Sequence, residues 1–146
     1  MAITYFSAER RTDGAVGAGE TLAFDTIIAS EGLGNQINYD MATGIVTLWE
    51  GGYYYINWFV APQFGFTTDG SNWTIIKGSS GLGFTGSSHT KVSATTGFAF
   101  VSVGADGDNF RLINSSDGEI ILSLATESKA GIVIHKVAQE YQPPPN

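Results

Sequence analysis

Hydrophobic and polar positions alternate in short runs along most of this chain, most clearly in the segment 22–60. The runs are rich in Val, Ile, Tyr, Phe and Trp, which suit a pleated, half-buried surface, and clusters of Gly, Asn and Asp separate them. No window shows a sustained helical period with caps, so we expect negligible helix. The pattern predicts strands at 3–8, 22–29, 36–39, 45–49, 53–60, 72–77, 90–95, 98–103, 109–114, 119–125 and 131–138.

Turn signals separate these strands at regular intervals, and they include Asp13-Gly14, Asp69-Gly70, Asp106-Gly107 and Asp117-Gly118. Short strands with this turn spacing are typical of a β-sandwich or barrel. We see no second domain and no repeat at a fixed spacing, so we expect one domain over 1–141. The segment 142–146 contains three consecutive prolines and is predicted to leave the body as an extended tail.

One predicted strand, 53–60, is apolar on both of its faces. Alternation places Tyr53, Tyr55, Asn57 and Phe59 on one face and 54, 56, 58 and 60 on the other. A strand that is apolar on both faces is not expected in a monomeric two-sheet sandwich, because the outer faces of its sheets normally contact water. An aromatic cleft for sugars is one interpretation, and a strand covered by another subunit is the one that we favour. The candidates for such a contact are Tyr53, Tyr55, Trp58, Phe59 and His135.

Composition supports a covered surface. Only 14% of the 146 residues are charged, against roughly 25% in an ordinary domain. So few charges suggest that part of the protein surface is covered, and identical subunits are the simplest cover. The formal net charge of −7 argues against nucleic acid or an anionic membrane as a partner. No run approaches the ~20 apolar residues of a membrane span.

Catalytic motifs are nearly absent from the sequence, so we expect no enzyme. With no cysteine and only His89 and His135, neither thiol catalysis nor a metal-ligand spacing is indicated. His135 lies in a strand-like run and is predicted to sit at a surface or a subunit contact. Gly81, Gly83 and Gly86 match a dinucleotide-binding spacing. That motif requires a helix directly after it, and the residues that follow Gly86 do not predict one. We therefore do not expect nucleotide binding.

Ligands of such a protein are expected to bind its loops, because its strand residues pack in the core or against other subunits. We expect three exposed segments, 64–73, 78–88 and 106–109. The ligand candidates in the first are Phe66, Asp69, Asn72 and Trp73, a mixture that suits sugar or peptide contacts. Trp49 and Trp73, which lie near turns, are further candidates for stacking on a ligand.

The turn at 106–109 is the one metal-like cluster. Asp106 and Asp108 offer two carboxylates one residue apart, which could hold calcium at millimolar affinity, or simply form an acidic turn. Phe110 breaks the pattern of an EF-hand loop. No other cofactor is predicted.

A series of short motifs recurs in a fixed order along the chain. In chain order the motifs are YFSAERR at 5–11, AFDTII at 23–28, NYD at 38–40 with TGIV at 43–46, GYYYI at 52–56, GFAFVSV at 97–103, GDNFRL at 107–112 and SKAGIVI at 128–134. This series resembles the globular-head domain of complement component 1q, within the tumour necrosis factor-like jelly-roll superfamily, and the resemblance covers nearly the whole chain. Two positions depart from that pattern, Lys129 in place of an aromatic residue and Gly51 in place of proline.

The resemblance implies a ten-stranded jelly-roll sandwich that assembles as a compact homotrimer and is not an enzyme. The segment 109–125 is most similar to bacterial members, the trimeric tips of collagen-like filament proteins on spore surfaces. The function expected from this is trimerisation and recognition on a bacterial spore or cell surface, with a collagen-like stalk, carbohydrate or protein as partners. The alternative is a structural phage virion protein, a capsid decoration or a fibre head.

Overall fold

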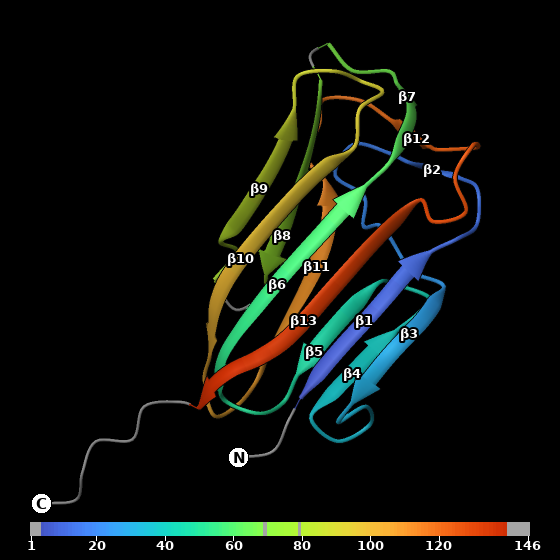
Figure 1. Cartoon of the computed structure of the whole chain (residues 1–146). Helices are drawn as coiled ribbons and strands as arrows, with labels where there is room; N and C mark the ends of the chain where they lie inside the picture. The colour runs from blue at the N-terminus through green and yellow to red at the C-terminus, as the bar shows by residue number, and fades with distance from the viewer. Residues whose placement is uncertain (1–3, 69, 79, 140–146) are drawn as a thin grey trace, which may run out of the picture.

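The computed structural model describes residues 4–68, 70–78 and 80–139, which form two five-stranded antiparallel sheets packed face to face (Figure 1). The first sheet has the order β10 (Thr95–Val103), β6 (Gly52–Val60), β13 (Ala130–Gln139), β1 (Tyr5–Arg10) and β3 (Thr26–Glu31). The second has the order β4 (Ile37–Asp40), β5 (Ile45–Leu48), β11 (Asp108–Asn114), β8 (Ser71–Lys77) and β9 (Gly83–Ser88).

A small third sheet closes one end of the sandwich, and it consists of β2 (Ala15–Val16), β12 (Ile120–Leu122) and β7 (Pro62–Gly65). The opposite end carries the start of β1 and the end of β13 together with the loops 32–36, 49–51 and 104–107 (Figure 1). We call this opposite end the terminal end. The described residues contain no helix, and hence none long and apolar enough to cross a membrane.

Alternating side chains from both sheets build the core. In β6 the inward residues are almost completely buried, as the alternation predicts. The second sheet meets them with Leu48, Trp73, Ile75, Phe110 and Leu112, all fully buried or nearly so. The two five-stranded sheets therefore confirm the predicted all-β, ten-stranded jelly-roll sandwich.

A glycine in β10 makes room for a tryptophan in this core. Gly97 pairs with Trp58 across the β10–β6 ladder, and a Cβ atom built on Gly97 would overlap the indole ring of Trp58. The indole therefore lies against the bare backbone of its neighbouring strand.

Several predicted strand boundaries are wrong. The strand expected at 22–29 is β3 at Thr26–Glu31, and the one expected at 119–125 covers only Ile120–Leu122. Two larger differences lie near 78–95. About half of the segment 78–88, which was expected to be an exposed loop, is strand β9, and it pairs with β8 from Ser71 opposite Ser88 to Ile76 opposite Gly83. The predicted strand at 90–95 is mostly a turn, and β10 begins only at Thr95. Serine and threonine side chains explain the turn, because the Ser88 hydroxyl accepts from the Thr90 N–H at 3.3 Å and the Thr90 hydroxyl accepts from the Ser93 N–H at 3.1 Å.

The exposed segment expected at 64–73 is also shorter than predicted. Its first residues belong to β7, which pairs with β12, and its last belong to β8. Only 66–70 connects the two strands. The predicted tail at 142–146 lies outside the described residues.

Candidate subunit interface and ligand-binding surfaces

The outward face of the first sheet carries a continuous set of aromatic side chains. We call it the aromatic face, and its members come from the four strands β10, β6, β13 and β1. They are Phe98, Phe100, Tyr53, Tyr55, Phe59, His135 and Tyr5.

Strand register brings these side chains together in rows across the sheet. One row runs from Phe100 through Tyr55 and His135 to Tyr5, each residue paired with the next. Ring contacts link neighbouring rows, since Tyr53 stacks on Phe100 with 6.0 Å between centroids and Tyr55 stacks on Phe98 at 6.5 Å. The His135 ring lies 5.5 Å from that of Tyr55. The face is thus an ordered layer of rings rather than a set of isolated surface residues.

Two phenylalanines on this face are largely exposed in the single chain. Phe98 is 71% exposed and Phe100 is 57% exposed, although both lie beside other aromatic rings. They were not among the predicted contact residues. The alternation of the sequence Gly97-Phe98-Ala99-Phe100-Val101 carries the signal that would have found them, because Ala99 and Val101 are buried and the two phenylalanines point to the opposite face.

The predicted contact residues are placed as expected with one exception. Tyr53, Tyr55, Phe59 and His135 lie on the aromatic face, where another subunit could reach them. Trp58 does not, because its side chain faces the core and is only 3% exposed. Its inclusion was wrong, since alternation gives Trp58 the inward face together with Tyr54 and Ile56.

The ligand candidates of the first loop are dispersed by the fold. Trp73 is fully buried between the sheets, so the prediction that it is exposed is wrong. The Asn72 side chain accepts a hydrogen bond from the Ser87 hydroxyl at 2.5 Å. Phe66 is 64% exposed and packs edge-on against Phe64 at 5.2 Å. Asp69 lies outside the described residues.

The two aspartates of the acidic turn differ in their surroundings. Asp106 is exposed, whereas Asp108 is almost buried, and its carboxylate lies 3.9 Å from the Lys77 ammonium. This positive charge would oppose a cation at Asp108. The described residues contain no group of three or more His, Cys, Asp or Glu side chains that could hold a metal ion. Calcium binding by this pair stays a prediction.

Comparisons with known proteins give no matching family model and no matching curated protein by sequence. Solved structures do match. The globular domain of zebrafish complement 1qA aligns over 96% of this chain and 99% of that chain, with a TM-score of 0.63 and 12% identity. Eiger TNF from S. frugiperda aligns over 100% and 99%, with a TM-score of 0.62 and 15% identity. The PRD1 vertex protein P5 aligns over 94% and 99%, with a TM-score of 0.63 and 16% identity.

The chain has the complement 1q and tumour necrosis factor-like jelly-roll fold. Each alignment covers nearly all of both chains, so the likeness concerns the entire sandwich rather than one sheet. Identities of this size establish the fold alone. The function must be argued from this chain's own surfaces.

Proposed function

We propose that this chain is a non-enzymatic head domain that assembles as a homotrimer through its aromatic face and is displayed on the outside of a cell or particle. The observation that carries the proposal is the ordered aromatic layer with Phe98 and Phe100 exposed at its edge strand. Contiguous exposed apolar surface of this kind marks interaction sites in soluble proteins.

The energetics favour burial of this face against apolar surface. Hiding apolar area from water contributes about 25 cal/mol per Å², and each aromatic side chain can bury 150–250 Å². A second or third copy of the same chain offers a surface of matching chemistry. An obligate assembly on this face is expected to bury above ~2,000 Å² in total.

Assembly as three copies is supported by the fold and by the sequence resemblance. The resemblance to complement 1q-like heads implies a compact trimer, and the first sheet supplies a broad apolar face on one side of the sandwich. The loops at the two ends of the sandwich stay available for other contacts. The low charged fraction of 14% is consistent with a surface that is partly covered.

Two placements of such a head are proposed, a bacterial spore or cell surface and, as second candidate, a virion. The first is supported by the sequence resemblance to the tips of collagen-like surface filaments. The second is favoured by the likeness to the PRD1 vertex protein P5. The genes adjacent to this one would separate them, because collagen-like or spore-coat genes indicate the first and capsid and tail genes the second.

The assembly is tested by the double substitution Phe98→Ser and Phe100→Ser. Both side chains are exposed in the single chain, so the protomer should still fold, while the apolar contact between protomers is lost. We expect multi-angle light scattering at micromolar concentration to give a trimer for the unmodified chain and a monomer for the variant. The matched control is Phe66→Ser, which removes an equally exposed phenylalanine away from this face and should remain trimeric.

A monomeric unmodified chain would refute the proposal. So would a double variant that is folded, as judged by circular dichroism, and still trimeric, because the aromatic face would then not be the contact.

A further inference from the structure

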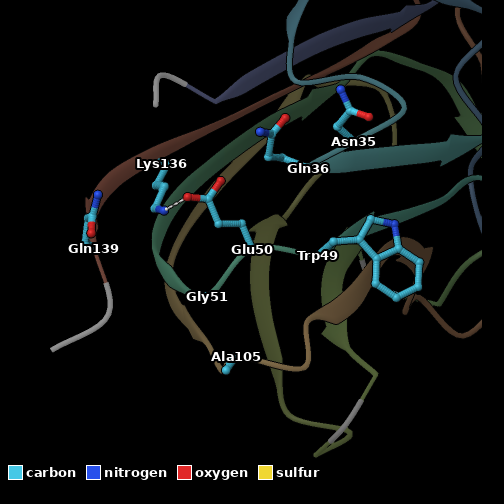
Figure 2. Close-up of a pocket in the computed structure, with 8 residues that line it drawn as sticks. All are labelled: Asn35, Gln36, Trp49, Glu50, Gly51, Ala105, Lys136 and Gln139. Atoms are coloured by element: carbon cyan, nitrogen blue, oxygen red, sulfur yellow. Dashed lines mark hydrogen bonds and ion pairs between the residues drawn. The ribbon is translucent and has the colours of Figure 1, made fainter. Parts of the chain in front are cut away.

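The terminal end of the sandwich contains a hollow of about 450 Å³ that the proposed assembly does not use (Figure 2). It is shaped by four segments that are distant in the sequence, namely the loop before β4, the loop between β5 and β6, the loop between β10 and β11, and the end of β13. The side chains that matter here are Asn35, Gln36, Trp49, Glu50, Lys136 and Gln139.

An ion pair lies at the centre of this hollow. The Lys136 ammonium donates to one Glu50 carboxylate oxygen at 2.6 Å, and the Lys136 side chain is only 2% exposed. Figure 2 shows the pair between the amides of Asn35 and Gln36 on one side and Ala105 on the other. Because the two charges neutralise each other at this distance, the hollow favours neither a free cation nor a free anion.

Unused hydrogen-bonding groups surround the pair. The side-chain amides of Asn35, Gln36 and Gln139 make no hydrogen bond within the described residues, and each offers two N–H donors and a carbonyl acceptor. The second Glu50 carboxylate oxygen is buried and has no hydrogen-bond donor within the described part of the chain. A ligand with several hydroxyl groups could satisfy these donors and acceptors, since every hydroxyl both donates and accepts.

Trp49 forms a wall of the hollow with a flat apolar surface. Its side chain is 53% exposed. It also borders a second hollow of about 390 Å³ beside Asp106 and Asn109. The exposed indole thus stands between two adjoining depressions. An aromatic ring in this position suits stacking against the C–H face of a ring-shaped ligand that continues from one hollow into the next.

One backbone hydrogen bond and one side-chain hydrogen bond hold the turn that carries Trp49 and Glu50. The Trp49 N–H donates to the Gln36 carbonyl at 2.8 Å, and the Tyr54 hydroxyl donates to the Glu50 carbonyl at 2.7 Å. Burial, with a smaller contribution from the Glu50 charge, raises the pKa of Tyr54 to about 12, so this hydroxyl keeps its proton. Gly107, with φ of +83°, lies under Trp49, where a Cβ atom would come within 3.4 Å of the indole. The two side chains therefore project from a preorganised turn.

We propose that this hollow binds a neutral, hydroxyl-rich ligand of the sugar class, with Trp49 as the stacking surface and Asn35, Gln36, Gln139 and Glu50 as hydrogen-bonding groups. The volume lies within the range of small-molecule sites. The site is built from one chain, so it does not depend on the assembly proposed above.

The experiment is saturation-transfer NMR of the full chain with a panel of neutral trisaccharides, namely maltotriose, cellotriose, mannotriose and chitotriose. We expect at least one to bind, and Trp49→Ala to weaken that binding by roughly tenfold through loss of stacking. Asn35→Ala, which alters an exposed amide without a hydrogen bond, should weaken it to a smaller extent and leave folding intact. Phe66→Ala is the matched control, because it removes an exposed aromatic ring from a loop outside the hollow.

The proposal is overturned if no trisaccharide of the panel binds, or if binding is equal in the unmodified chain, Trp49→Ala and Asn35→Ala. Displacement of the bound sugar by calcium chloride or inorganic phosphate would also overturn it, since the ligand site would then be one for ions. Light scattering on the same samples reports the oligomeric state separately, so failure here is distinguishable from failure of the trimer.

Discussion

At the scale of single residues, Asp25 shows how one side chain fixes the chain's path between strands. It precedes β3, and its carboxylate accepts from the backbone N–H groups of Arg11 and Thr12 at 3.0 Å and from the hydroxyls of Thr12 and Thr26 at 2.7 and 2.8 Å. Burial acts to raise the pKa of Asp25, but these hydrogen bonds outweigh it and lower the pKa to about 2. The carboxylate thereby ties the end of β1 to the start of β3.

A pH dependence of stability follows from this shift. Because the pKa of Asp25 is lower in the folded chain than its ordinary value of 3.8, its contribution is fully present above about pH 4 and is lost as the pH falls towards 2. We expect Asp25→Asn to reduce the free energy of unfolding at pH 7 by ~1–2 kcal/mol. Urea unfolding between pH 7 and pH 2 should show a smaller loss for the variant than for the unmodified chain, and parallel curves would contradict the assignment.

The tryptophans show what sequence could and could not predict about single residues. Nearness to a turn indicated exposure for both Trp49 and Trp73, and this is right for Trp49 alone. Trp73 follows a turn too, but it belongs to β8, where it shares the inward face with Ile75 and is fully buried. The sequence predicted this strand at 72–77, so the alternation within it, rather than the nearby turn, carried the information about exposure.

At the scale of elements, alternation predicted most strands because branched and aromatic residues mark their inward faces. It missed β2, β7 and β9. The longest of these, β9, contains Gly83 and Gly86, and glycines leave no side chain to alternate. Gly86 lies so close to the backbone of Thr96 in β10 that a side chain would collide with it. Gly86, which looked like a loop residue, thus allows the close approach of the two sheets.

The contact of Gly97 with Trp58 gives a prediction for the β6–β10 pair. Gly97→Ala would place a methyl group against the indole ring, and overpacking of this kind costs about 1–3 kcal/mol. Gly104→Ala is the matched control, because open space surrounds that position. Urea unfolding at one fixed protein concentration should give a lower midpoint for Gly97→Ala only. Equal midpoints would mean that the indole moves aside at little cost.

At the scale of the whole molecule, the sequence predicted a surface that another subunit covers, and the structure shows the aromatic face that such a subunit would meet. Strand 53–60 carried this signal because its two faces are both apolar. The terminal hollow could not be predicted in the same way. Its lining residues come from segments as distant as 35 and 139, and they share no local pattern until the jelly roll brings them together.

The central claim is the assembly of three copies through the aromatic face, and sedimentation equilibrium of the unmodified chain tests it most directly. A single chain has a mass of 15.5 kDa, and an obligate contact resists dilution. We expect three times this mass at all concentrations from micromolar upward. A mass of 15.5 kDa at micromolar concentration would contradict the account, and a stable mass of twice that value would contradict the trimer.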